Sequence, residues 1–162
     1  MAVHKLILDD TCSESLYTLF AIHCRLEDYR LAYLLNKHLG ITLSRKASDL
    51  DFKNGQISYS IYEWKDDKQL ITWSLVSNIC KTEELQESNY TSLFDNQEKI
   101  TKTFQLIPEY KTVNYFLKID SEFNFSKEKY ILDNILDIPQ IATAYHIKDS
   151  NELKSKDNLI FH

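Results

Sequence analysis

The 162-residue sequence contains only two glycines, Gly40 and Gly55, and two prolines. With so few glycines, neither a GxGxxG dinucleotide-binding turn nor a glycine-rich phosphate-binding P-loop is present. A GxSxG nucleophile elbow is absent for the same reason. The sequence therefore gives no support for a bound nucleotide, and we predict a protein without a cofactor.

The cysteines and histidines are too scattered for a metal centre. Cys12, Cys24 and Cys80 show no CxxC spacing, and the five histidines show no HxxxH or HExxH pattern. Cys24 and His146 form a conceivable nucleophile pair, but a buried and inert thiol in a core strand explains Cys24 better. An odd, sparse set of cysteines is typical of reduced thiols in the cytoplasm. We therefore predict no metal and no disulfide framework.

Long apolar runs and clusters of positive charge are also missing. No segment approaches the 18 apolar residues of a membrane span, and the first ten residues lack the apolar core of a signal peptide. The net charge is -5, with lysines and acids mixed along the chain, which argues against a nucleic-acid partner. We expect a cytoplasmic protein that binds neither membrane nor nucleic acid.

The chain is rich in aromatic residues, with ten Tyr, eight Phe and two Trp, and 43% of its residues are hydrophobic. A chain of this length and composition can bury a core without metal or disulfide bonds. We predict a single α/β domain over residues 1–162. It has a short N-terminal arm at 1–16, a surface loop at 80–100 and a C-terminal tail at 149–162.

Apolar patterning predicts the secondary structure. Residues 17–24 suit a strand, and residues 26–39 form an amphipathic helix that Gly40 ends. Alternation predicts strands at 57–61, 70–79, 112–119 and 141–147, with a hairpin connection at 64–69. A second helix begins at Ser126 as N-cap, with a Phe125–Tyr130 hydrophobic staple, and ends before Pro139. The polar stretch 81–99 is either a long surface loop or a loop with one short helix around 83–87.

This order of elements contains two β-α-β units, around residues 17–64 and 112–148. The simplest assembly is a ferredoxin-like α+β sandwich, in which a mixed sheet of about five strands has both helices packed on one face. A mixed sheet with the first helix packed differently stays open, because periodicity does not distinguish the two arrangements.

One short motif is distinctive. Residues 107–117 read IPEYKTVNYFL, and residues 28–36 read DYRLAYLLN. These segments resemble the IPExxxVDY family of small bacterial proteins, and the resemblance implies a cytosolic protein without an assigned biochemical activity. This chain has Asn114 where the family motif has Asp, which leaves open any role that needs a carboxylate at that position.

The residues of the motif can also be interpreted without reference to any family. Pro108 fixes its own φ just before a strand, and so sets the angle at which the strand enters the sheet. Glu109 can accept hydrogen bonds from nearby backbone amides or pair with a base such as Arg30. Val113 and Tyr115 share one face of the alternating strand, which favours a structural role for the motif over a catalytic one.

The predicted sheet has two faces, and only one of them has helices to cover it. If Tyr59, Ile61, Val113, Tyr115 and Leu117 face the helices, then the opposite face presents Tyr62, Trp64 and Phe116. The cover for that face is the N-terminal arm at 3–8, the C-terminal residues 159–161, a second subunit or another partner. The first hypothesis is therefore a non-enzymatic interaction or scaffold domain that binds a protein partner, or itself, through this face or a sheet edge.

The second hypothesis is a regulatory small-molecule-binding module of ferredoxin-like type. Its pocket would lie near Glu109, Asn114 and Asp120, at the carboxyl end of the motif strand, where open α/β sheets often bind ligands. The third hypothesis, an enzyme, has no catalytic constellation behind it, so we name no catalytic residue.

Overall fold

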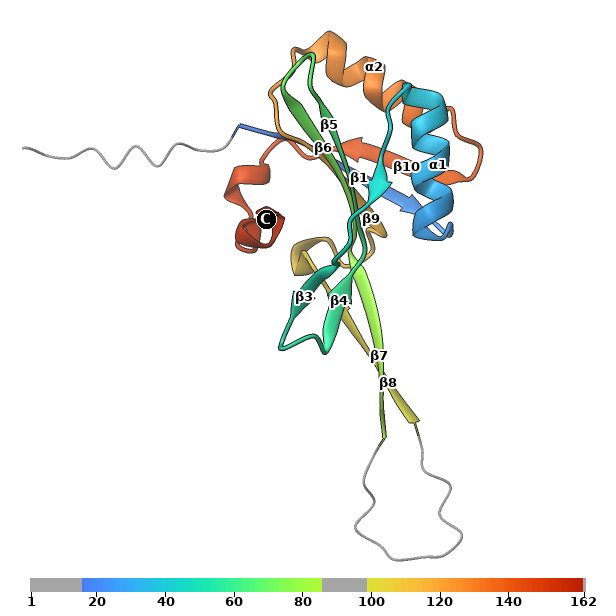
Figure 1. Ribbon diagram of the computed structural model, residues 1–162, viewed down its shortest axis with the longest axis vertical. Helices are drawn as coiled ribbons and strands as arrows, with labels where there is room; N and C mark the ends of the chain where they lie inside the picture. Colours follow the sequence, from blue (N-terminus) through green and yellow to red (C-terminus); the bar gives the residue numbers. More distant parts are fainter. Residues whose placement is uncertain (1–15, 86–98, 162) are drawn as a thin grey trace, which may run out of the picture.

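The computed structural model describes residues 16–85 and 99–161. Most of the predicted N-terminal arm and the middle of the predicted 80–100 loop therefore lie outside the described residues. The described residues form two α-helices, ten strands and three short 3-10 helices, and Figure 1 shows their arrangement. They are β1 (Thr18–Cys24), α1 (Asp28–Leu39), β2 (Ser44–Arg45), β3 (Leu50–Phe52), β4 (Ile57–Tyr59), β5 (Ile61–Asp66), β6 (Ile71–Ser77), β7 (Ile79–Leu85), β8 (Lys99–Gln105), η1 (Pro108–Tyr110), β9 (Tyr115–Ile119), α2 (Phe125–Leu136), β10 (Ile141–His146), η2 (Ser150–Glu152) and η3 (Lys156–Leu159).

The main sheet has six strands in the order β10-β1-β9-β6-β5-β2, and each neighbouring pair is antiparallel. Consequently β1 runs parallel to β6 with β9 between them, and β9 runs parallel to β10 with β1 between them. The mixed α/β content is confirmed, and the sheet is larger than the expected five strands. Two small sheets, β3-β4 and β7-β8, complete the described strands.

The first helix forms as the sequence predicts. Asp28 lies in its first turn, and Gly40 ends it in the left-handed conformation at φ 66°, which glycine adopts without strain. The second helix begins differently. Asn124, and not Ser126, is its N-cap, because the Asn124 side chain accepts a 2.8 Å hydrogen bond from the Lys127 amide. The predicted staple is wrong: Phe125 is 74% exposed at the helix start.

The sheet is buried on both faces, with the helices on one side and the C-terminal turns on the other (Figure 1). Leu31 and Leu35 of α1 and Ile131 and Ile135 of α2 pack with Leu117 in a helix-side core. The far-side core is closed by the chain's own motif loop and C-terminal segment. Its buried members are Leu19, Ala21, Ile57, Tyr59, Ile61, Val76, Leu106, Ile107, Val113, Phe116, Ile147 and Leu159.

Several predicted facings are therefore wrong. Tyr59, Ile61 and Val113 lie in the far-side core and not against the helices. Tyr62 is buried in the helix-side core, and Trp64 packs against it. Both alternating residue sets are apolar in a sheet buried on two sides, so alternation identifies two faces without saying which one meets the helices.

The polar segment after residue 79 also differs from expectation. A helix around 83–87 is wrong for its described part, because residues 79–85 form β7 and pair with β8 from Ile79–Gln105 to Leu85–Lys99. This hairpin and the β3-β4 hairpin project together from one end of the main sheet (Figure 1). No helix within residues 16–85 and 99–161 is long and apolar enough to cross a membrane.

Candidate functional site

Two strands change partner at one point in the fold. The Ser77 amide donates a 3.0 Å hydrogen bond to the Ser60 carbonyl, and the Ser60 amide donates a 3.1 Å bond to the Ser77 hydroxyl. On one side of this contact β5 pairs with β6, and on the other side β4 pairs with β3 while β7 pairs with β8. In the described part of the chain β4 and β7 do not pair with each other. A groove opens where these two strands separate.

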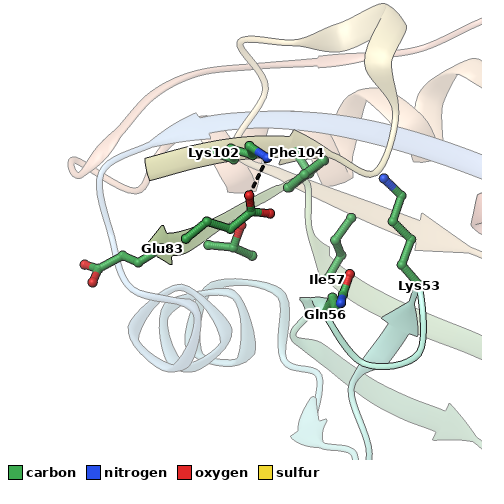
Figure 2. A pocket seen from close by; sticks show the side chains of 8 residues that line it. Lys53, Gln56, Ile57, Glu83, Lys102 and Phe104 are labelled. Atoms are coloured by element: carbon green, nitrogen blue, oxygen red, sulfur yellow. Dashed lines mark hydrogen bonds and ion pairs between the residues drawn. The ribbon is translucent and has the colours of Figure 1, made fainter. Parts of the chain in front are cut away.

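The groove has a volume of about 490 Å³ and lies between the two hairpins. In Figure 2, Lys53 and Gln56 reach it from the β3-β4 turn, whereas Lys102 and Phe104 reach it from β8 on the opposite side. An adjoining recess of about 280 Å³ shares Lys53, Ile57 and Phe104. The other residues that line the groove are Thr82, Glu83 and Glu84, and those that line only the recess are Phe52, Tyr59, Gln105, Leu106 and Asn158.

Some charged side chains at the groove form ion pairs among the described residues and one does not. Lys102 forms an ion pair with Glu84, and Lys99 lies 3.3 Å from Glu83. The Lys53 ammonium lies 5.0 Å from the centre of the Phe104 ring, and no described carboxylate is within ion-pair distance of it. Lys53 has a φ of 50°, an unusual value for a residue with a side chain. The backbone of the turn thus places at the groove an ammonium that has no carboxylate partner within residues 16–85 and 99–161.

The recess beside the groove is mostly apolar. The rings of Phe52 and Tyr59 meet edge to face at 5.8 Å, and Leu106 is buried beside them. Burial raises the pKa of Tyr59 to about 12, with a smaller contribution from Cys80. The Asn158 amide donates a 2.8 Å hydrogen bond to the Leu106 carbonyl, which fixes the C-terminal segment at the rim. Such a recess suits one apolar side chain of a ligand.

The groove is lined by charged, polar and apolar side chains. The eight residues that line it include one hydroxyl, that of Thr82, and no histidine or cysteine. Among the described residues, no group of three or more His, Cys, Asp and Glu side chains is placed to hold a metal ion.

The loop that carries the sequence motif is held by a residue that sequence reasoning missed. Asn78 is fully buried, and its amide nitrogen donates to the carbonyls of Tyr110 and Val113 at 2.8 and 2.9 Å. Its side-chain oxygen accepts a 2.8 Å bond from the Ile107 amide. The signal in the sequence is a single Asn within the apolar, β-branched stretch 70–79, because a buried amide must find partners.

The predicted site residues of the motif have structural partners. Glu109 accepts hydrogen bonds from the Ser155 amide at 3.0 Å and the Ser155 hydroxyl at 2.6 Å. These bonds, the hydroxyl first, lower the pKa of Glu109. The expectation that Glu109 accepts a backbone amide is thus met, whereas Arg30 pairs with Glu27 at 3.7 Å. Glu109 fastens the C-terminal segment to the motif loop.

Asn114 and Asp120 lie at opposite ends of β9. Six residues of extended chain separate them by roughly 20 Å, so they do not line one pocket. The Asn114 side-chain oxygen accepts a 3.1 Å bond from the Cys24 amide. Asp120 pairs with Lys118 at 2.8 Å in a separate polar hollow of about 190 Å³. The structure therefore does not bring Glu109, Asn114 and Asp120 together.

The three aromatic residues predicted for an exposed sheet face are also dispersed. Tyr62 lies in the helix-side core and is 7% exposed, and Trp64 packs against the same core. Phe116 lies in the far-side core and is fully buried. The C-terminal segment is the cover that the sequence left undecided: Leu159 is buried there and Phe161 packs beside it.

Comparison with known proteins gives no further assignment. No protein-family model, no curated protein and no solved structure matches the chain. The resemblance of residues 107–117 to the IPExxxVDY family therefore stays a prediction.

Proposed function

We propose that this chain is a non-enzymatic protein-interaction domain that binds an extended segment of a partner protein in the groove between β4 and β7. The observation that carries the proposal is the separation of these two strands beside an apolar recess. Each strand has a hydrogen-bonded strand partner on one side only within the described residues, so each has a second edge without ladder hydrogen bonds. Free strand edges bind extended peptides through main-chain hydrogen bonds.

The lining of the groove suggests the chemistry of the bound segment. The recess formed by Ile57, Tyr59 and Phe104 accepts an apolar side chain. Lys53, which has no carboxylate partner among the described residues, favours an acidic side chain next to that apolar one. A short acidic-apolar sequence in extended conformation meets both requirements.

The proposed fold and family of this chain are supported by its strand topology and by its sequence motif. The strand order β10-β1-β9-β6, with parallel β1/β6 and β9/β10 pairs on either side of a middle strand, supports a ferredoxin-like core to which β5 and β2 are added. The motif at 107–117 supports membership of the IPExxxVDY family and, through it, a bacterial cytoplasmic protein. The small-molecule alternative gains no support, because Glu109, Asn114 and Asp120 are engaged separately.

Panning a random peptide phage library on the full chain tests the groove. Selected peptides are then titrated by fluorescence anisotropy against wild type, Phe104→Ala and Lys53→Glu. We expect both variants to raise the Kd by about tenfold or more, because each removes a central contact. Phe125→Ala and Lys65→Glu are the matched controls, since both side chains are exposed elsewhere. Failure to enrich any peptide, or equal affinity for wild type and the groove variants, would contradict the proposal.

A further inference from the structure

The two edges of the main sheet are protected to very different degrees. At one edge, β2 has only two residues, and its Arg45 forms ion pairs with Asp28 at 3.4 Å and Asp49 at 2.7 Å. Short length and charge are the devices by which proteins prevent an edge strand from pairing with another chain. This edge is closed to a further strand.

At the other edge, β10 lacks both devices. It has six residues, and residues 141–145 (IATAY) carry no charge. His146 is turned toward the helix side, where its Nδ1 lies 3.3 Å from Glu128 and its ring lies beside Phe20. Ala142, Thr143 and Tyr145 are exposed. Within residues 16–85 and 99–161 the only pairing partner of β10 is β1.

The hydrogen-bond pattern identifies the groups on this free edge. The Ile147 amide donates a 2.8 Å bond to the Leu19 carbonyl, and the register places Ala21 opposite Tyr145. Bonded and non-bonded pairs alternate along an antiparallel ladder. The N–H and C=O groups of Ala144 and His146 therefore point away from β1, and no other described backbone group bonds to them.

We propose that β10 pairs with β10 of a second copy of this chain, antiparallel across a two-fold axis, so that one sheet runs through both copies. In a two-fold pair the same strand faces itself, so any charge on it tends to face a like charge. An uncharged strand avoids this repulsion. The small side chains of Ala142, Thr143 and Ala144 offer no pocket for recognising a different sequence, which favours self-pairing over another partner.

The outward-pointing groups fix the register of this pair. Ala144 lies opposite Ala144 of the second copy, so that these two residues exchange their free N–H and C=O groups; the register shift that leaves Ala142 unpaired with β1 lies beyond this central pair. Thr143 then lies opposite Tyr145 in a non-bonded pair, where side chains approach most closely. Thr143 is exposed in the single chain, and Tyr145 is 36% exposed with its ring beside those of His23 and Tyr110; neither side chain belongs to the two buried cores.

Sedimentation equilibrium of the full chain tests the proposal. We expect a wild-type dimer and, for the double variant Thr143→Lys/Tyr145→Lys, a dimer dissociation constant raised by about tenfold or more, because lysines face each other twice. Mixing this variant with Thr143→Glu/Tyr145→Glu should restore a dimer that contains one copy of each. Circular dichroism of the variants checks that the fold is intact.

Three results would overturn the proposal. The first is a wild-type chain that remains monomeric at its highest soluble concentration. The second is a dimer that neither the lysine pair nor the mixed pair affects, which would place the interface elsewhere. The third is slow amide exchange of Ala144 and His146 in a monomeric sample, which would mean that another segment of the same chain covers the edge.

Discussion

The side-chain oxygen of Asn78 accepts a 2.8 Å hydrogen bond from the backbone amide of Ile107, so the strand junction and the motif loop are directly joined. The Asn78 main chain adds two more bonds, from its amide to the Asn114 carbonyl and from the Leu106 amide to its own carbonyl, both at 2.8 Å. A buried amide whose partners are all backbone groups fixes the path of the chain around it. The motif loop therefore owes its shape to a residue outside the motif.

Replacing Asn78 should be costly. Asn78→Ala removes three side-chain hydrogen bonds and leaves buried groups of Ile107 and Val113 without these partners. At about 1 kcal/mol or more for each, we expect the free energy of unfolding to fall by roughly 3–5 kcal/mol in urea titrations. Asn134→Ala, which loses a surface bond to the Tyr130 carbonyl, is the matched control and should stay within about 0.5 kcal/mol. Equal losses for both variants would contradict this account.

The Glu109–Ser155 contact should make the C-terminal segment sensitive to acid. Folding lowers the pKa of Glu109, so its contribution is present above the ordinary value of 4.5 and is lost as the pH falls through the lower folded value. We expect wild type to exceed Glu109→Gln in stability at neutral pH and this difference to shrink below pH 4.5. Urea titrations at several pH values measure it.

Limited trypsin cleavage at Lys154 and Lys156 provides a local readout of the same contact. Both Glu109→Gln and Ser155→Ala should accelerate cleavage there at neutral pH, because either change frees the segment. Glu122→Gln is the control, since its carboxylate makes no hydrogen bond or ion pair among the described residues. Cleavage at an unchanged rate in all three variants would show that Glu109 does not hold the segment.

Tyr59 should make the protein sensitive to base. Burial raises its pKa from 10.0 to about 12, so the neutral phenol stabilises the fold below pH 10.0 and this stability is lost as the pH rises toward 12. The unfolding free energy of wild type should therefore fall relative to that of Tyr59→Phe between about pH 10 and 11. A difference between the two proteins that is constant with pH would mean that Tyr59 ionises normally.

The start of α2 provides a test of capping. Asn124 accepts the Lys127 amide, whereas the predicted cap, Ser126, lies inside the helix and is exposed. Asn124→Ala should lower the free energy of unfolding by about 1 kcal/mol, and Ser126→Ala should change it by less than about 0.5 kcal/mol. Thermal unfolding followed by circular dichroism distinguishes the two positions, and the reverse order would restore Ser126 as the cap.

Local signals in the sequence predict local structure well in this chain. The Gly40 stop, the charge pattern of α1 and the alternation of β9 and β10 each identify an element, because their causes lie within a few neighbouring residues. β4 lies within the strand predicted at 57–61, whereas its partner β3 was not predicted, because β3 has only three residues. The β7-β8 hairpin was missed because its residues are mostly polar and its pairing joins segments far apart in sequence.

The apolar periodicity of the sequence does not predict the candidate site. The groove exists because β4 and β7 separate at Ser60 and Ser77, and no sequence pattern marks where two strands exchange partners. The prediction that Tyr62 and Phe116 share one face of the sheet was wrong for a related reason. Their relative placement depends on the registers of β5 with β6 and of β6 with β9, which a sheet buried on both faces does not reveal in its alternation.

The closure of the far-side core by the end of the described chain has a consequence for synthesis. All buried residues of the helix-side core lie at or before Ala144, whereas Ile147 and Leu159 of the far-side core emerge from the ribosome later. A nascent chain can thus assemble the helix-side core while the opposite surface of the sheet, which the motif loop covers in part, still lacks Ile147 and Leu159. During that interval the growing polypeptide exposes apolar surface that chaperones can bind. A product truncated before Leu159 would keep this apolar surface exposed.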